Sequence, residues 1–211
     1  MDDKRKYVLK QLEKEKLIAI IRNIKIAEFL DVIEELREGG INCVEISANT
    51  TNYADMIKIA KSRGFITGAG TILKEEQFNC TSKLGVDFIL SPVLDINLIK
   101  ACSRHHIVSV PGAMTPTEIY EAEKNGADMV KVFPCSALGS RYIKDILAPL
   151  SGLKIMAVGG ISEVNAKEFL AAGASCLGIG SLLVNRENAS LHKRNTIREK
   201  AIALKAMCGG V

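Results

Sequence analysis

The chain has 211 residues, of which 47% are apolar, enough for one substantial hydrophobic core. Its net charge of +4 comes from well-mixed charges, so it does not indicate a nucleic-acid partner, and an anionic substrate explains the excess equally well. No uncharged apolar run is long enough to span a membrane and the charged N-terminus is not a signal peptide, so we expect a cytoplasmic protein without a membrane partner.

One unit repeats along the chain: a short apolar run, a polar turn, an amphipathic helix and a glycine that suits the left-handed position after a helix. The first fifteen residues are predicted to form an extra helix that covers the bottom of the fold. The predicted strands are Leu17–Ile21, Cys43–Ile46, Phe65–Thr67, Phe88–Leu90, Ile107–Val110, Met129–Val132, Lys154–Ala157 and Cys176–Ile179. The clearest predicted helices are Ala27–Glu38, Lys74–Leu84, Thr115–Lys124, Ala166–Ala171 and Thr196–Met207.

Eight apolar strands that alternate with helices indicate a parallel sheet buried on both faces, which closes most naturally into a (β/α)8 TIM barrel. With so few residues the barrel must be compact, and we expect all of residues 1–211 to form one domain. The rival fold is an open doubly wound sheet. That fold would want a glycine-rich turn after the first strand, and the turn Arg22–Lys25 has no glycine.

The six cysteines include no CxxC pair, and no histidine and cysteine spacing fits a zinc site. Cys43 and Cys176 lie in apolar strands and are expected to be small buried side chains in a reducing compartment. His105-His106 precedes a strand and is expected in a surface turn, and His192 in a solvated segment. The sequence therefore predicts no disulfide framework, no metal site and no cofactor.

Two charged residues stand alone inside apolar strands. Lys131 lies in the run MVKVF, where burial would lower the pKa of its amine and free it as a nucleophile toward a ketone. The alternative is a lysine that reaches solvent from the strand end, or a structural ion-pair partner. Glu45, in the run VEI, meets Lys131 in the barrel mouth if both point inward, and can then move protons. The alternative for this pair is a structural one only.

Glycine-rich segments follow three of the predicted strands. Gly159-Gly160 and Gly178-Ile179-Gly180-Ser181 follow the seventh and eighth strands, where barrels commonly bind phosphate through backbone N–H groups and a helix N-terminus. The alternative is turn glycines alone. In Gly68-Ala69-Gly70-Thr71 the backbone can approach the mouth closely, and Thr71 either donates a hydrogen bond to a substrate carboxylate or simply caps a helix.

In this order and spacing, eight segments resemble the KDPG (2-keto-3-deoxy-6-phosphogluconate) and 4-hydroxy-2-oxoglutarate aldolase family. The segments are IAIIRN, GGINCVEIS, TGAGTIL, FILSPVLD, VPGAMTPTE, VKVFPCSALG, AVGGIS and LGIGSLLV. The resemblance implies a metal-free class I aldolase, usually a homotrimer, with Lys131 as Schiff-base lysine and Glu45 as proton shuttle. It also assigns substrate-binding roles to Arg22, which would clamp a carboxylate, to Thr71, Pro92 and Phe133 in the pocket, and to Gly159, Gly160, Gly180 and Ser181 at the phosphate.

Two departures from the gluconate enzymes favour the 2-keto-3-deoxy-6-phosphogalactonate branch. Asn49 stands where some KDPG aldolases have an arginine, and Val158 replaces a threonine of the PTGG motif; the stretch CSALGSRYIK points the same way. The expected reaction cleaves the 6-phosphorylated sugar acid to pyruvate and glyceraldehyde 3-phosphate. The alternatives are a 4-hydroxy-2-oxoglutarate aldolase, which yields pyruvate and glyoxylate, and a non-catalytic phosphosugar-binding barrel.

Overall fold

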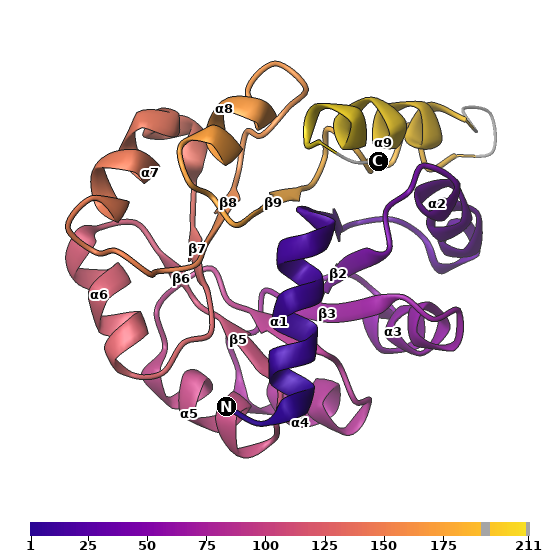
Figure 1. Cartoon of the computed structure of the whole chain (residues 1–211). Coiled ribbons are helices and arrows are strands. Elements are labelled where there is room, and N and C mark those ends of the chain that lie inside the picture. The colour runs from indigo at the N-terminus through magenta and orange to yellow at the C-terminus, as the bar shows by residue number, and fades with distance from the viewer. Residues whose placement is uncertain (191–194, 210–211) are drawn as a thin grey trace.

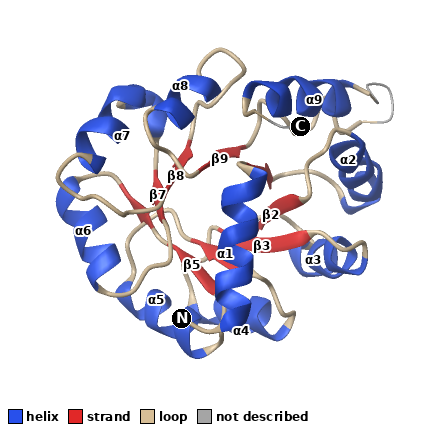
Figure 2. Ribbon diagram, in the orientation of Figure 1, coloured by secondary structure: helices blue, strands red, loops and turns tan. Residues whose placement is uncertain are grey.

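The computed structural model, which describes residues 1–190 and 195–209, is a parallel barrel of strands inside a ring of helices (Figures 1 and 2). His192 lies outside the described residues. The strands are β1 (Leu17–Ile21), β2 (Cys43–Ser47), β3 (Ile66–Gly70), β4 (Phe88–Leu90), β5 (Val108–Val110), β6 (Gly112–Ala113), β7 (Val130–Val132), β8 (Ile155–Val158) and β9 (Cys176–Ile179).

The barrel closes at β5 and β6, which stand at the two ends of the sheet order β5-β4-β3-β2-β1-β9-β8-β7-β6. Only Pro111 separates them. We expected eight strands, and the described residues form nine, because the short strand β6 follows the predicted end of the fifth strand at Val110. Pro111 has no N–H to donate and separates β6 from β5. Backbone hydrogen bonds still join this segment to β7 and the residue before it, since Met129 N donates to Ser109 O (3.3 Å) and Lys131 N to Pro111 O (2.8 Å). The closed barrel excludes the doubly wound sheet.

The helices lie outside the strands, with one exception: α1 (Asp3–Glu15) crosses the N-terminal end of the barrel (Figure 1). This confirms the predicted covering helix. The other helices are α2 (Ile26–Glu38), α3 (Tyr53–Ser62), α4 (Glu75–Lys83), α5 (Ile96–Arg104), α6 (Pro116–Lys124), the short 3-10 helix η1 (Cys135–Ala137), α7 (Gly139–Leu147), α8 (Ala166–Ala171) and α9 (Thr196–Met207). No helix among residues 1–190 and 195–209 is both long and apolar enough to cross a membrane.

Alternation along the strands divides the core in two. In β2, Val44 and Ile46 join the large apolar cluster that packs the strands against the helices. Cys43, on the opposite face, belongs to a second cluster inside the barrel, which Leu9 and Leu12 of α1 close from below. Because successive strand residues point to opposite faces, Glu45 shares the inner face with Cys43.

Several predicted boundaries need correction. The third strand runs from Ile66 to Gly70, beyond its predicted end at Thr67, so Gly68 and Gly70 lie within the strand. The propensity of glycine argues against strand, but tertiary packing decides here: a Cβ at Gly68 would lie 2.2 Å from the ring of Phe88. The fourth helix begins at Glu75, one residue later than predicted. His105 and His106 follow α5 in a turn at the bottom, as expected.

Candidate active site

Glu45 lies in the middle of β2 with its side chain inside the barrel and 2% of the residue exposed. Its carboxylate accepts a hydrogen bond from Ser47 Oγ at 3.0 Å. It also lies directly over Gly70 of the neighbouring strand, in space that any side chain at that position would take. Gly70 is therefore required there because the carboxylate needs the room.

Lys131 lies in the middle of β7, across the barrel from β2, and 8% of it is exposed. Its neighbours Val130 and Val132 belong to the outer cluster, whereas Met129 belongs to the inner one. By alternation the Lys131 side chain also faces the interior. Its Nζ lies 4.7 Å from the centroid of the Phe133 ring, which is a favourable position for an ammonium over an aromatic face.

The electrostatics of the two buried groups favour their neutral forms. Burial raises the pKa of the Glu45 carboxyl above its ordinary value, and the charge of Lys131 opposes this rise without cancelling it. Burial likewise lowers the pKa of the Lys131 amine, against the opposing effect of Glu45, while Arg22 adds to the lowering. A carboxyl that holds its proton to higher pH and an amine that loses its proton at lower pH suit acid–base and nucleophilic chemistry.

Arg22 and Thr71 lie at the rim of the mouth. Arg22 follows β1, is exposed, and is close enough to act on the pKa values of both Glu45 and Lys131. Thr71 follows β3 with a left-handed backbone (φ 57°). The capping alternative for Thr71 is wrong, because α4 starts from Lys74, whose N–H is bonded to the side chain of Gln77. Thr71 remains a candidate for the carboxylate contact.

Pro92 and Phe133 flank the candidate lysine. The backbone of Pro92 packs on Gly112, where a Cβ would lie 2.4 Å from the Pro92 carbonyl carbon, and Gly112 is the strand partner of Lys131. The Phe133 ring is 37% exposed and reaches toward the next loop, since a Cβ at Gly159 would lie 3.2 Å from its Cδ2 atom. Both residues thus border the mouth near Lys131.

The two glycine loops follow neighbouring strands, because β8 and β9 pair through Val158 and Gly178. Gly159 and Gly160 both have left-handed backbones (φ 95° and 73°). The expected support from a helix N-terminus is wrong in both loops. Helix α8 begins only at Ala166, and the chain after Gly180 makes a single turn before it continues irregularly. Turn residues there separate the strand end from regular helix, so backbone N–H groups and the Ser181 hydroxyl remain as candidate anion donors.

The sequence prediction missed two contributors to the site. Ser47 orients the Glu45 carboxylate, and Ser136 in η1 lies against the Gly159-Gly160 loop, with its Oγ 2.7 Å from where a Cβ at Gly160 would stand. Ser47 follows Glu45 by two residues in a strand, and this spacing places both on one face. Nothing local to Ser136 indicates its position, since the contact joins two loops.

A buried lysine with a lowered pKa and a buried glutamate with a raised pKa, inside the mouth of a (β/α)8 barrel, are the arrangement of a class I, Schiff-base aldolase, a lyase. The chain belongs to the KDPG and KHG aldolase family, whose model matches residues 8–199. The predicted family and fold class are confirmed.

Two curated aldolases are similar to this chain over most of its length. The chain is 36% identical over 194 residues to a probable 2-dehydro-3-deoxy-6-phosphogalactonate aldolase of Rhizobium meliloti, covering 90% of each protein. It is 34% identical over 194 residues to the 2-dehydro-3-deoxy-6-phosphogalactonate aldolase of Escherichia coli, covering 90% of this chain and 93% of that protein.

Two solved aldolase structures have the same fold as this chain. A native KDPGal structure superposes with a TM-score of 0.84 at 31% identity, covering 92% of this chain and 94% of that one. A KDPG aldolase of Legionella pneumophila, captured with pyruvate as a covalent carbinolamine, superposes with a TM-score of 0.83 at 27% identity, covering 90% and 93%.

Proposed function

We propose that this aldolase cleaves 2-keto-3-deoxy-6-phosphogalactonate to pyruvate and glyceraldehyde 3-phosphate, with Lys131 as the covalent residue. The observation that carries the proposal is the pair of buried, pKa-shifted groups, Glu45 and Lys131, that face one interior from opposite strands. The carbinolamine reported for the Legionella relative supports an imine route in the same fold. All 211 residues would form this one aldolase domain.

The proposed reaction begins with the neutral Lys131 amine, which attacks the C2 ketone to form a carbinolamine. Glu45 gives its proton to the departing hydroxyl, so water leaves, an iminium forms and Glu45 becomes a carboxylate. The raised pKa of Glu45 suits this first role as an acid. Arg22 at the rim would hold the substrate carboxylate, and Thr71, Pro92 and Phe133 would enclose the pyruvyl end.

Carbon–carbon cleavage follows from the iminium. Glu45 takes the C4 hydroxyl proton, the C3–C4 bond breaks as the aldehyde forms, and the electron pair passes into the enamine. Glu45 then returns the proton to C3, and hydrolysis of the imine releases pyruvate and restores the Lys131 amine. Gly159, Gly160, Gly180 and Ser181 would bind the distal phosphate through backbone N–H groups and the Ser181 hydroxyl.

We propose the galactonate-derived substrate, and not its gluconate-derived epimer, for two reasons. Both relatives described above carry that name. In addition, Val158 faces the barrel interior at the top of β8, where its methyl groups offer the substrate no hydroxyl. The deciding experiment compares kcat/KM for the two C4 epimers, where we expect the galactonate-derived one to be higher. The opposite order assigns the enzyme to the gluconate branch.

A second candidate, 4-hydroxy-2-oxoglutarate, carries no phosphate. The family description covers aldolases of this substrate too. Its kcat/KM, measured beside the two epimers, is expected to be the lowest of the three because it forfeits the distal phosphate contacts. The third alternative, a non-catalytic phosphosugar-binding barrel, does not agree with the aldolase family to which the chain belongs, and borohydride trapping of a pyruvate imine tests it directly.

The partner and location expected from the sequence are also proposals. We infer a homotrimer: Leu73 and Val93, on neighbouring loops beside the mouth, are 55% and 52% exposed and would be covered by another subunit. Light scattering after gel filtration tests it, and a monomer would overturn it. A cytoplasmic location agrees with six cysteines that are all unpaired, as a reducing compartment requires.

A further inference from the structure

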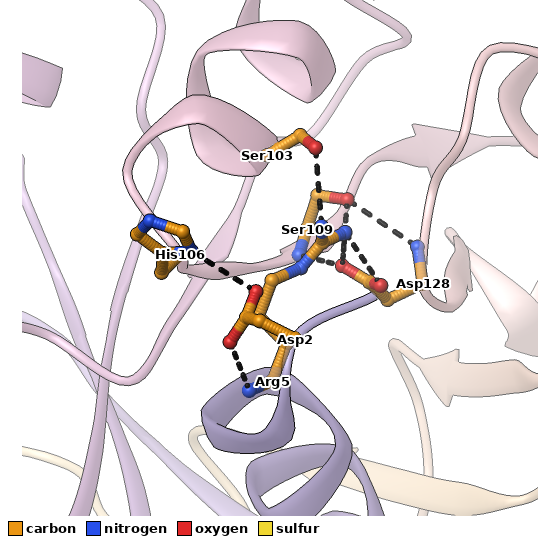
Figure 3. Close-up of polar contacts among 6 residues, drawn as sticks. All are labelled: Asp2, Arg5, Ser103, His106, Ser109 and Asp128. Carbon is orange, nitrogen blue, oxygen red and sulfur yellow. Dashed lines mark hydrogen bonds and ion pairs between the residues drawn. The ribbon is translucent and has the colours of Figure 1, made fainter.

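Arg5 is a buried charge far from the mouth, in the helix α1 that covers the barrel bottom (Figure 3). Only 6% of it is exposed. Its Nη2 donates to both carboxylate oxygens of Asp128 at 2.7 Å, and its Nη1 donates to Ser103 Oγ at 3.1 Å. The two terminal nitrogens thus form a fork that holds two partners, the Asp128 carboxylate and the Ser103 hydroxyl, so the contact has direction as well as charge.

Asp128 joins three elements through this one carboxylate. It stands two residues before β7, and besides Arg5 of α1 it accepts from Ser109 N (2.9 Å) and Ser109 Oγ (3.2 Å) of β5. Figure 3 shows these side chains converging between the helix and the strands. We call Arg5, Asp128 and Ser109 the floor clamp.

The floor clamp sits on the seam where the barrel closes. Across this seam β5 has ended by Val110, β6 has only two residues, and Pro111 donates no hydrogen bond. The backbone N–H of Lys131 donates to Pro111 O on the same seam at 2.8 Å. On its other side β7 pairs with β8 through Val130–Val132, but few strand hydrogen bonds hold it on the seam side. The floor clamp supplies a side-chain link there, at the lower end of β7.

We propose that Arg5 is a positioning residue for the reaction: through Asp128 it holds β7 against β5 and so fixes where Lys131 presents its amine. This inference rests on the proposed covalent role of Lys131. Arg5 itself touches no reacting atom, since the inner apolar cluster lies between the floor clamp and the mouth. Val108 and Met129 of that cluster stand beside the seam.

If the contact between β5 and β7 loosens, the pKa of Lys131 should change. The charged groups that act on Lys131 are Glu45 from β2 and Arg22 from the end of β1. The groups that act around the floor clamp are Arg5 from α1 and Cys102 from α5, whose thiol pKa is raised by burial and by Asp128. If β7 shifts, water reaches the Lys131 amine and the burial that lowers its pKa weakens. The pKa then rises toward that of an ordinary lysine.

The experiment measures the pH dependence of pyruvate imine formation by borohydride trapping in full-length variants. Arg5→Met keeps the apolar stem but removes the fork. We expect the pH midpoint of imine formation in this variant to rise by about one unit. Imine formation is then about tenfold slower below the midpoint and unchanged well above it. Arg5→Lys should be intermediate, because lysine keeps the charge without the paired donors. Melting temperatures and circular dichroism confirm that the variants compared are folded.

The matched control is Glu13→Ala, which breaks another anchor of the same helix, the contact of Glu13 with Lys154, away from the seam. Its midpoint should equal that of the wild type. A folded Arg5→Met protein with a wild-type midpoint overturns the proposal, and so does an equal shift in Glu13→Ala. If Arg5→Met does not fold, Ser109→Ala replaces it, with a smaller upward shift expected and an unchanged midpoint overturning the idea. A wild-type adduct mapped elsewhere than Lys131 refutes the proposed function instead.

Discussion

The Glu45 carboxylate occupies the place where a side chain at Gly70 would begin: a Cβ there would lie 1.6 Å from Glu45 Oε1. Gly70 has no left-handed backbone requirement, so the conformational freedom of glycine does not explain it. The missing side chain itself matters. One strand thus makes room for the acid–base group that its neighbour carries.

From this relationship we predict that Gly70→Ala slows turnover by displacing Glu45, by about the 10²–10⁴-fold that a positioned acid–base group contributes. Cleavage kinetics test it. Gly68→Ala is the control, because its Cβ would lie 2.2 Å from the Phe88 ring, in the same strand, without touching Glu45. Turnover lost equally in both variants would mean that general crowding, and not the position of Glu45, is responsible.

Lys131 should be the residue that pyruvate and borohydride modify. Its burial lowers its pKa, which gives it more neutral amine at pH 7 than an exposed lysine has. Peptide mass mapping locates the adduct, and modification of Lys61 or Lys154 instead would contradict the assignment. Lys131→Arg should abolish cleavage, because a guanidinium does not deprotonate near neutral pH.

Glu45→Gln should leave the fold intact and reduce turnover by about 10²–10⁴-fold, since glutamine keeps the shape but carries no proton to transfer. It should also move the midpoint for imine formation to lower pH. The Glu45 charge raises the Lys131 pKa, and its removal leaves the lowering by burial and by Arg22 unopposed. A midpoint that stays fixed or rises would show that the two groups do not interact.

The same substitution should change stability with pH in a defined direction. The folded-state pKa of Glu45 is raised above 4.5, so its contribution to stability is fully present below pH 4.5 and is lost as pH rises through the folded pKa. Glutamine does not titrate. The melting temperature of Glu45→Gln relative to the wild type should therefore increase from pH 4.5 toward neutrality, and a constant difference would contradict the raised pKa.

Sequence reasoning works well where the signal is local. Alternation and helical periodicity locate the strands, and single charges in apolar strands indicate Glu45 and Lys131. It fails where the cause is a contact between distant residues. Arg5 and Asp128 are 123 positions apart, and the packing that keeps Gly70 in a strand depends on its neighbouring strand. Pro111 is visible in the sequence, but the sequence does not show that β5 before it and β6 after it both form part of the barrel.

Gly160→Val should raise KM for the phosphorylated substrate while pyruvate imine formation at Lys131 continues. Gly160 has φ 73°, and a Cβ there would lie 2.3 Å from Ser136 Cβ, so a side chain must push this loop away from η1. That displacement moves the backbone N–H groups proposed to bind phosphate. It leaves Lys131, deeper in the barrel, in place. Steady-state kinetics and borohydride trapping separate the two effects.

The control for backbone strain alone is Gly64→Val. Gly64 has a similar φ of 76°, has no atom within contact distance of an added Cβ, and follows α3 at the bottom of the barrel. A left-handed valine there should lower the melting temperature without changing KM. The wild type should also react poorly with an unphosphorylated analogue, which lacks the remote binding energy that orients the reacting bond. Equal kcat/KM for the phosphorylated substrate and the unphosphorylated analogue would contradict the proposed phosphate site and favour 4-hydroxy-2-oxoglutarate as the substrate.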